Sequence, residues 1–425
     1  PSQRFMLNLS FNFLKNIKSF IFPFYRNKDL KFIFKKLQEG IPEDKVAARF
    51  VGGCVRKHLS NEKIDDIDIA TILTTDQIKE KFKDTNLKVI DTGIKHGTVT
   101  IVSKNHKVEL TTLRKDIKTD GRHAEVEYTD NWQQDSERRD FTINAIYMDI
   151  NGKLYDPQMG TVDLKNKNIK FIGDPQKRIE EDYLRIVRFI RFKVMYDIVV
   201  EPTTSDAIKQ NLDGIQKISK ERILIELLKI LSLKNFLTIN QSSNLREIFS
   251  MIFPEFLYLN RLERLKKIYQ YSEVNVDILL AVMLIDDKEN HEYFIHKYNA
   301  SNKTKETLEQ FYKNLIKLKN DKEFFEKNLI KNVYLNGKNH LIALNLINFS
   351  INSKVKINDF TKTLNKILKI KVPIFPIDGE ILKQKGMQEG QSLGNVLKTL
   401  EKEWINNNFK ISNERVEEII KVNSN

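Results

Sequence analysis

Cysteine, long apolar runs and internal repeats are scarce or absent in this sequence. Cys54 is the only cysteine among 425 residues, so no disulfide can form within the chain. That scarcity favours a reducing compartment, and we expect a cytoplasmic protein. The longest clear apolar run, residues 278–285, is far shorter than the roughly 20 residues that a helix needs to cross a bilayer. We therefore expect no membrane association.

Acidic residues are outnumbered by basic ones, which gives the chain a net charge of +14. An excess of this size suggests a polyanionic partner. Lysine and asparagine are abundant throughout the chain, so coding bias is a second explanation for the excess. A chain of 425 residues is long enough for several domains.

The first 28 residues contain five basic residues, many phenylalanines and no acids. One interpretation is an organelle transit segment. The other, which we favour, is an amphipathic first helix that is broken at Pro23 and packs on the domain that follows. Residues 1–28 are therefore treated as an N-terminal extension.

A Gly-Gly turn and the acids that follow it carry the clearest chemical signal. Gly52 and Gly53 can bring backbone N–H groups close to phosphate oxygens, because no Cβ blocks the approach. Arg56 follows, and Asp66 and Asp68 lie one residue apart in an expected strand, so they should share one face. Neighbouring carboxylates suit a hard divalent cation such as Mg²⁺, which also takes water and phosphate oxygens. The combination predicts a metal-dependent nucleotide site, whereas either half alone is equally a plain turn or a solvated acidic strand edge.

A third carboxylate lies on the strand that we expect over residues 107–113. Glu109 has an apolar residue on each side, so it should project from the opposite face and could join Asp66 and Asp68. Read from its strand alone, it is a surface glutamate. The polar segment 116–125 has no apolar period and a glycine pivot, so we expect a loop, either solvent filler or a mobile element over a site.

Arg138 and Arg139 directly precede Asp140 in the next motif. A guanidinium binds phosphate through two parallel hydrogen bonds, so arginines beside a carboxylate cluster suit a triphosphate. Asp140 and Asn144 are spaced i,i+4 and should share one face of a helix. The alternative is an exposed, charged start of a helix.

Strand signals end near Leu154, and helical signals dominate from about residue 163 to the C-terminus. Residues 29–40 also have helical spacing of apolar positions. The helical part is interrupted at Gly214, Pro254, Gly337 and residues 373–379. The pattern predicts a mixed α/β region followed by a long helical remainder.

These motifs, in this order, resemble those of the class II tRNA nucleotidyltransferases, the CCA-adding enzymes, which share a superfamily with bacterial poly(A) polymerases. The matching segments are residues 52–56 with 66–71 (first motif), 92–99, 109–114, 121–124 (flexible loop), 138–145 (second motif), 181–188 (nucleotide-reading motif) and 218–223 (the motif that braces it). The resemblance is strong over residues 47–230 and resumes weakly at residues 376–379 and at Gly386, Gly390 and Gly394. Met159 is a departure, because the family often has a glycine there, in the hinge between head and neck.

The resemblance implies an α+β fold. The head would be a nucleotidyltransferase domain with a small, mostly antiparallel sheet and helices, and an all-α neck, body and tail would follow. The expected segments are 1–28 (extension), 29–160 (catalytic head), 161–265 (neck with the nucleotide-reading motif), 266–370 (body) and 371–425 (tRNA-binding tail).

The resemblance also implies a reaction, the template-independent addition of CMP and AMP from CTP and ATP to the 3′ end of tRNA. Asp66 and Asp68 would hold two Mg²⁺ ions that clamp the attacking and leaving oxygens of an in-line displacement. Glu109 would help to deprotonate the attacking 3′-hydroxyl or fix the metal–substrate geometry. The triphosphate would be bound by Gly52, Gly53, Arg56 and Arg139, and the ribose by Asp140 and Asn144.

Asp182 and Arg185 of the nucleotide-reading motif are spaced i,i+3, so in one helix their side chains would be neighbours. Such a pair is commonly a plain surface ion pair. It also offers one acceptor beside one donor, which matches the Watson–Crick edges of cytosine and adenine but opposes those of uracil and guanine. Arg188 could support this pair or touch phosphate.

The helical remainder would bind the tRNA acceptor arm by shape and backbone. Within it, Gly386, Gly390 and Gly394 are candidate points of close approach to phosphate, although they are equally plain turn glycines. Arg122 of the flexible loop is a further RNA-binding candidate.

Three other functions compete with CCA addition. A poly(A) polymerase is disfavoured because residues 92–99 resemble the CCA-adding enzymes more closely. An enzyme that adds only A remains open, whereas the presence of residues 121–123 argues against addition of C alone. A catalytically silent RNA-binding protein would require Asp66 or Asp68 to be misplaced. No His-Asp dipeptide occurs, so we expect no added phosphohydrolase activity.

Overall fold

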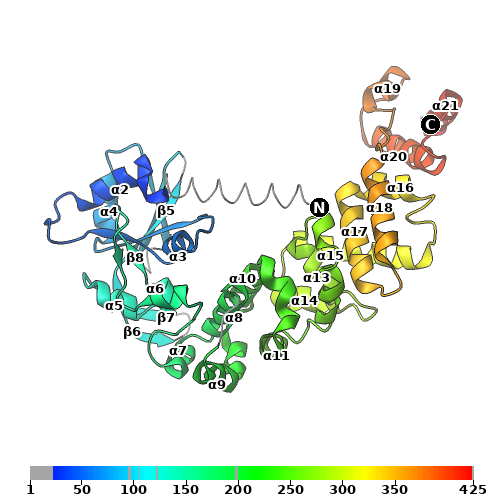
Figure 1. Cartoon of the computed structure of the whole chain (residues 1–425). Helices are drawn as coiled ribbons and strands as arrows, with labels where there is room; N and C mark the ends of the chain where they lie inside the picture. The colour runs from blue at the N-terminus through cyan, green and yellow to red at the C-terminus, as the bar shows by residue number, and fades with distance from the viewer. Residues whose placement is uncertain (1–22, 94–96, 105, 121–122, 197–199, 424–425) are drawn as a thin grey trace. The chain divides into compact units, whose positions relative to one another are not determined.

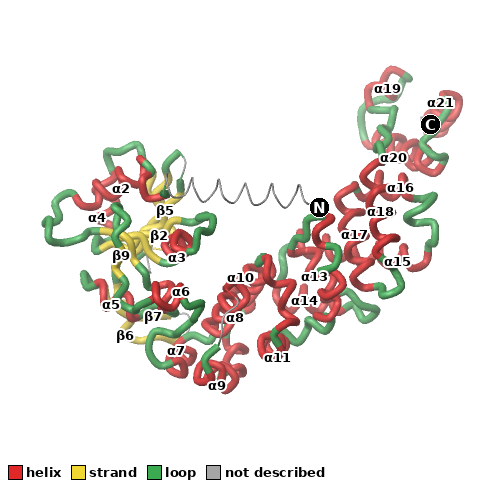
Figure 2. The backbone as a smooth tube through the Cα atoms, in the orientation of Figure 1, coloured by secondary structure: helices red, strands yellow, loops and turns green. Residues whose placement is uncertain are grey.

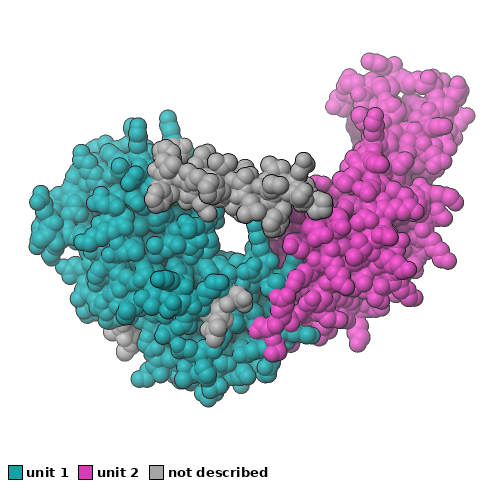
Figure 3. Space-filling model, in the orientation of Figure 1, with its two compact units in different colours: residues 1–239, 244–252 teal, residues 240–243, 253–425 magenta. Residues whose placement is uncertain are grey.

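A computed structural model describes residues 23–93, 97–104, 106–120, 123–196 and 200–423. The chain forms two compact units, residues 1–239 with 244–252 and residues 240–243 with 253–425 (Figure 3). The division between them falls inside the segment expected as the neck, 161–265. The five expected segments remain predictions.

The first unit contains a seven-stranded sheet with the strand order β3-β4-β5-β2-β1-β8-β9 (Figures 1 and 2). Its strands are β1 (Ala48–Val51), β2 (Ile67–Thr71), β3 (Lys88–Gly93), β4 (Thr98–Val102), β5 (Lys107–Thr112), β8 (Tyr147–Met148) and β9 (Leu154–Tyr155). Only the pair β2–β5 is parallel, and the other described pairs are antiparallel. The small, mostly antiparallel sheet expected for the head is confirmed.

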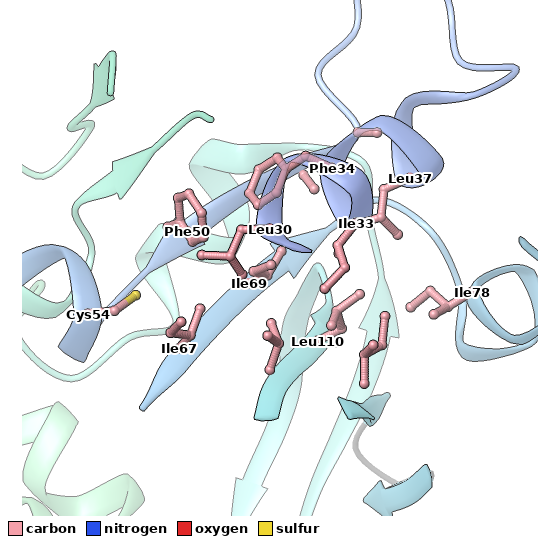
Figure 4. Close-up of a cluster of buried hydrophobic side chains, with 14 of the residues drawn as sticks. Leu30, Ile33, Phe34, Leu37, Phe50, Cys54, Ile67, Ile69, Ile78 and Leu110 are labelled. Carbon is pink, nitrogen blue, oxygen red and sulfur yellow. The ribbon is translucent and has the colours of Figure 1, made fainter. Parts of the chain in front are cut away.

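Helix α2 (Lys28–Gln38) covers one face of this sheet (Figure 4). Leu30, Ile33, Phe34 and Leu37 recur at helical spacing and are buried in the same core as strand residues such as Ile69. Burying a side chain of this size contributes roughly 1.5–3 kcal/mol. Two more helices belong to this part of the head, α3 (Gly53–Leu59) and α4 (Thr75–Phe82).

We expected residues 116–125 to be a loop, but residues 116–120 and 123–125 belong instead to two paired strands. Strands β6 (Arg114–Asp120) and β7 (His123–Tyr128) form a separate two-stranded sheet. Because this ribbon is not part of the larger sheet, its sequence need not show the apolar alternation of a strand that covers a core. At its base the Tyr128 ring fills the space beside Gly97 (φ +70°), where an added Cβ would lie 2.7 Å from the ring. Arg122 lies outside the described residues.

Helices account for the elements described after β9, as the sequence predicts. The first unit has α5 (Trp132–Glu137) before β8 and then α6 (Gly160–Lys165), α7 (Pro175–Glu181), α8 (Leu184–Tyr196), α9 (Pro202–Gln210), α10 (Lys220–Leu231) and α11 (Ser243–Ile252). The second has α12 (Leu262–Leu265), α13 (Val276–Leu284), α14 (Asn290–Tyr298), α15 (Asn302–Asn320), α16 (Leu329–Asn336), α17 (Lys338–Ile351), α18 (Ile357–Lys369), α19 (Gly379–Gln384), α20 (Gln391–Asn406) and α21 (Asn413–Asn423). Short 3₁₀ turns are η1 (Phe24–Arg26), η3 (Thr142–Asn144), η4 (Leu212–Lys217), η5 (Lys234–Gln241), η6 (Leu259–Arg261) and η7 (Tyr269–Tyr271).

The apolar run noted in the sequence is the buried helix α13. Residues 278–285 are all buried in the second unit, so a globular core explains their hydrophobicity. Among the described residues, none of the helices combines the length and the apolar character that crossing a membrane requires.

Candidate active site

The parallel pairing of β2 and β5 places Asp68 beside Glu109. The two residues are direct partners in the strand register, so their side chains leave the same face of neighbouring strands about 4.8 Å apart. Ile67 and Ile69 point to the opposite face, into the core under α2. Sequence reasoning placed Glu109 correctly, although the register that brings it to Asp68 could not be predicted from one strand.

Asp66 and Gly52 complete this corner of the sheet. Asp66 lies one residue before β2 and is exposed, and it is close enough to raise the pKa of Asp68. Gly52 has φ +71°, and a Cβ at this position would lie 3.9 Å from Asp68 Oδ2. Gly53, which begins α3, has open space where a Cβ would be. The turn therefore leaves open space at Gly53, whereas Gly52 is buried beside Asp68.

The acids at this corner have no cation of their own. Burial and the nearby Glu109 charge together raise the pKa of Asp68 to about 6, although Arg139 opposes the shift. Among the described residues, no side-chain hydrogen bond or ion pair reaches Asp66, Asp68 or Glu109, and no three His, Cys, Asp or Glu side chains are gathered closely enough to hold a metal ion by themselves. The donor set therefore fits a hard divalent cation that takes its remaining ligands from water and phosphate.

Asp68 and Glu109 face a cavity of about 460 Å³ that also exposes three arginines. The cavity is lined by Val51, Asp68, Ile69, Thr92, Gly93, Thr98, Glu109, Thr111, Arg114, Arg138 and Arg139. Carboxylates and guanidiniums around one cavity are what a metal–triphosphate complex requires. Arg139 lines this cavity together with Asp68 and Glu109, and its contact with a triphosphate stays a prediction.

Asp135, which sequence reasoning missed, binds two of these arginines, Arg138 and Arg139. Its side chain has no exposure and accepts hydrogen bonds from Arg138 Nε at 2.9 Å and from Arg139 Nη2 at 3.0 Å. The spacing i,i+4 from Asp135 to Arg139 was the available signal, but such pairs are common on helix surfaces.

A second network of hydrogen bonds links several of the residues that are predicted to bind the nucleotide. Arg56 donates to the Asn144 side-chain carbonyl, and Asn144 Nδ2 donates to Asp140 Oδ1 at 2.8 Å. Arg188 donates to Asp140 Oδ2 from Nε at 2.8 Å and also lies near the buried Glu226. Burial raises the pKa of Asp140, but Arg188 and Asn144 outweigh it and hold that pKa well below its usual range.

The helix predicted for this motif is wrong, because residues 142–144 form only the 3₁₀ turn η3 after an extended Phe141. The side chains of Asp140 and Asn144 nevertheless meet, since a single turn brings residues four apart together.

Asp182 and Arg185 do not form the pair predicted from helical spacing. Asp182 is extended, between α7 and α8, and its Oδ1 accepts from the backbone N–H of Leu184 at 3.1 Å, as a helix cap does. Its Oδ2 accepts from Arg222 at 2.6 Å. Arg185 instead contacts Glu181 at 2.5 Å. The predicted bracing by residues 218–223 is confirmed by the Arg222–Asp182 bond.

Tyr183, between these two residues, packs directly on Gly214 of η4. A Cβ on Gly214 would lie 2.1 Å from the Tyr183 ring, so no side chain fits there. Gly214, which the sequence marks as a helix break, thus allows Tyr183 of the nucleotide-reading motif to pack against η4.

The hinge residue Met159 adopts a left-handed conformation, with φ +56° and ψ +29°. Glycine adopts this conformation without strain, which explains why a glycine is common here and why methionine carries a cost. The next residue, Gly160, is restricted in a different way, because its Cβ would lie 2.1 Å from the Thr142 carbonyl oxygen.

The three candidate RNA-binding glycines lie in the second unit near α19 and α20. Gly386 (φ +94°) and Gly390 (φ +152°) have backbone conformations that require glycine. Gly394 lies within α20 and has nothing within 4 Å of its Cβ position, so packing against the described residues gives no reason for a glycine.

Comparisons with known proteins agree with this geometry. Residues 48–170 match the family model described as the Poly A polymerase head domain, and residues 197–258 match the probable RNA and SrmB-binding site of polymerase A. The chain is 31% identical over 402 residues to CCA tRNA nucleotidyltransferase 1, mitochondrial, of Danio rerio, with 89% of this chain and 88% of the relative covered. It is 32% identical over 425 residues to the Homo sapiens protein of the same name, with 91% and 89% covered.

The fold matches a solved structure as well. The crystal structure of Bacillus stearothermophilus CCA-adding enzyme in complex with CTP superposes with a TM-score of 0.68 at 24% identity, covering 92% of this chain and 96% of that one. Taken with the two full-length relatives, these matches show that the chain belongs to the family of CCA-adding tRNA nucleotidyltransferases.

Proposed function

We propose that this protein adds CMP and AMP, without a template, to the 3′ end of tRNA. The observation that carries the proposal is the register of β2 and β5, which sets Asp68 beside Glu109 in a cavity with Arg139. In the reaction the tRNA 3′-oxygen forms a bond to the α-phosphorus of CTP or ATP, and the bond to pyrophosphate breaks. Glu109 takes the hydroxyl proton or fixes the geometry of the attack.

Enzymes of this family generally use a divalent metal ion. We propose Mg²⁺, held by Asp66 and Asp68. When bound, Mg²⁺ would neutralise part of the negative charge of the phosphates. Arg56 and Arg139, with the backbone of Gly52 and Gly53, contact the triphosphate. Asp140 and Asn144 bind the ribose, and Asn144 also accepts a hydrogen bond from Arg56.

We propose that Asp182 and Arg185 select the base, although each is held by a different partner and the two do not pair with each other. Arg222 fixes the Asp182 carboxylate and Glu181 fixes the Arg185 guanidinium, so an acceptor and a donor are each oriented before a base arrives. Cytosine and adenine satisfy both groups, whereas uracil and guanine leave them unpaired at a large cost.

One assay distinguishes the proposed function from the three competing functions. The protein is incubated with tRNA that ends before C74, ends after C75, or is complete, and with each NTP in turn or with CTP and ATP together. CCA addition predicts that the first substrate takes C from CTP alone and C followed by A when CTP and ATP are supplied together, that the second takes A alone, and that the third takes nothing. Extension of only the second identifies an A-adding enzyme, long A tails identify a poly(A) polymerase, and no extension identifies a non-catalytic RNA-binding protein.

Arg185→Ala tests the reading role. We expect discrimination against UTP and GTP to relax or incorporation to be lost, while Arg246→Ala, an exposed arginine on α11, leaves selection unchanged. Discrimination that survives in Arg185→Ala removes the residue from base selection.

The second unit is proposed to bind tRNA, with Gly386, Gly390 and Gly394 near phosphates, and Arg122, which lies outside the described residues, stays a further RNA-binding candidate. Gly394→Ala is a clean probe, because alanine stabilises a helix by about 0.5–1 kcal/mol relative to glycine. We expect higher thermal stability with weaker tRNA binding. Higher stability with unchanged affinity makes Gly394 a plain helix residue.

A cytoplasmic location remains our proposal for this chain, although the Danio rerio and Homo sapiens relatives carry the word mitochondrial in their names. Imaging of the tagged full-length protein distinguishes the two compartments.

A further inference from the structure

Asp135 on α5 is surrounded by hydrogen-bond donors. Its carboxylate accepts from Arg138 (Nε 2.9 Å, Nη2 2.8 Å) and from Arg139 (Nε 3.2 Å, Nη2 3.0 Å). The Tyr147 hydroxyl donates at 2.7 Å, and the backbone N–H of Arg114 donates at 3.3 Å. A carboxylate offers about four lone-pair positions, so this one has no capacity left for a ligand.

The two arginines bound to Asp135 form part of the wall of the cavity that Asp68 and Glu109 also line. Adjacent guanidiniums repel each other, and each side chain has many rotamers. A buried carboxylate between them removes the repulsion and fixes both orientations. Burial raises the pKa of Asp135, but Arg139 and Arg138 lower it well below its usual range, so the group stays charged at every working pH.

We infer that Asp135 is the positioning residue that presents Arg138 and Arg139 together to the triphosphate of the incoming nucleotide. The inference rests on the proposed function and extends it, because it adds Arg138 to the phosphate-binding wall and assigns the alignment of that wall to a residue that never touches substrate. Tyr147 is the second support, since its hydroxyl contacts Asp135 and also accepts from Arg139 Nε at 3.0 Å.

Asp135→Asn tests the inference with inorganic tripolyphosphate, a probe that engages only the phosphate wall. We expect its dissociation constant, and the KM values for CTP and ATP, to rise at least about tenfold, because small misplacements of aligned groups have large effects. Selection of C and A over U and G should not change. A merely structural role lowers the melting temperature but leaves tripolyphosphate affinity of the folded protein at the wild-type value.

Glu255→Gln in the second unit is the matched control. Glu255 is also a buried carboxylate, bound by Tyr298 Oη at 2.5 Å and Lys297 Nζ at 2.8 Å, and its replacement should alter stability alone. Tyr147→Phe, which removes one contact to Asp135 and one to Arg139, should raise the tripolyphosphate constant about two- to threefold, and it decides the matter if Asp135→Asn does not fold.

Wild-type affinity for tripolyphosphate in a folded Asp135→Asn protein, or in Tyr147→Phe when the first variant fails to fold, overturns the inference. Failure of the proposed function is a separate result, namely wild-type protein that extends no tRNA.

Discussion

Two groups of acids in the first unit differ in their partners. The sheet acids, Asp66, Asp68 and Glu109, receive no described hydrogen bond or ion pair, and the pKa of Asp68 is raised to about 6. The arginine-held acids, Asp135 and Asp140, are saturated by donors, and their pKa values are lowered. Asp66 and Glu109 are exposed, whereas Asp68 is partly buried like Asp140, so for these two the difference lies in the neighbours. Acids without partners are ready for an external cation, whereas saturated acids orient the groups around them.

The largest expected effect concerns the sheet acids. Asp68→Ala should reduce nucleotide addition by about a thousandfold or more, because the loss of a metal ligand removes several kcal/mol of transition-state stabilisation. Affinity for tRNA, measured by gel shift, should remain near the wild-type value. Asp65→Ala is the matched control, since Asp65 is exposed and paired with Lys57 and Lys63. Substantial turnover by Asp68→Ala would remove this acid from the metal site.

Removing an arginine-held acid should instead weaken the fold. Asp140→Asn leaves the mostly buried Arg188 without its closest partner, and we expect the free energy of unfolding to fall by about 2–4 kcal/mol. Chemical denaturation measures the change. Asp91→Asn, which breaks the exposed pair with Lys79, should lower it by less than about 1 kcal/mol. If Asp140→Asn and Asp91→Asn lower the free energy of unfolding equally, Asp140 has no special structural role.

The same substitution at Asp68 should have the opposite sign. Its carboxyl ionises near pH 3.8 in the unfolded chain but only near pH 6 in the fold, so the charged form is disfavoured in the native state. Asp68→Asn removes that charge, and we expect a gain of about 1–2 kcal/mol at pH 7 in metal-free buffer. Denaturation with a chelator present measures it, and a loss of stability would show that the sheet acids are already balanced by cationic neighbours.

The pH dependence of the wild type follows from the same shift. Between about pH 4 and pH 6 the folded protein binds more protons than the unfolded chain, so in metal-free buffer the Asp68 contribution to stability falls as pH rises through this window. Mg²⁺ requires the ionised carboxylate, so its affinity should drop by up to about tenfold per unit below pH 6 and level off above it. Mg²⁺ titrations from pH 5 to 8 test this, with Asp68→Asn giving a flatter profile. Equal affinity at pH 5 and pH 7 contradicts it.

Local patterns in the sequence predict the parts of the site that depend on local geometry. The spacing of Leu30, Ile33 and Leu37 predicts α2, and strand alternation predicts that Asp68 and Glu109 leave the core face. The identity of their partners depends on contacts between distant segments. Asp135 looks like any acid four residues before an arginine, and only the fold shows that it has no exposure.

The reading motif shows how a local rule fails when a second preference competes with it. Helical spacing joins Asp182 to Arg185, but aspartate is also a strong helix cap, and here it ends one helix and begins the next. Arg222, forty residues away, then takes the freed carboxylate oxygen. The hairpin at residues 114–128 was missed for a related reason, since its pairing has no counterpart in apolar periodicity.

The register that joins Asp68 to Glu109 makes the length of one short connection chemically important. Residues 103–106 link β4 to β5. If a one-residue insertion there made β5 slide along β2 by one residue, Val108 or Leu110 would replace Glu109 beside the cavity, and the Glu109 carboxylate would point into the core. A single slip would therefore damage folding and catalysis together. Natural variation at this bend should favour replacement of residues over changes in their number.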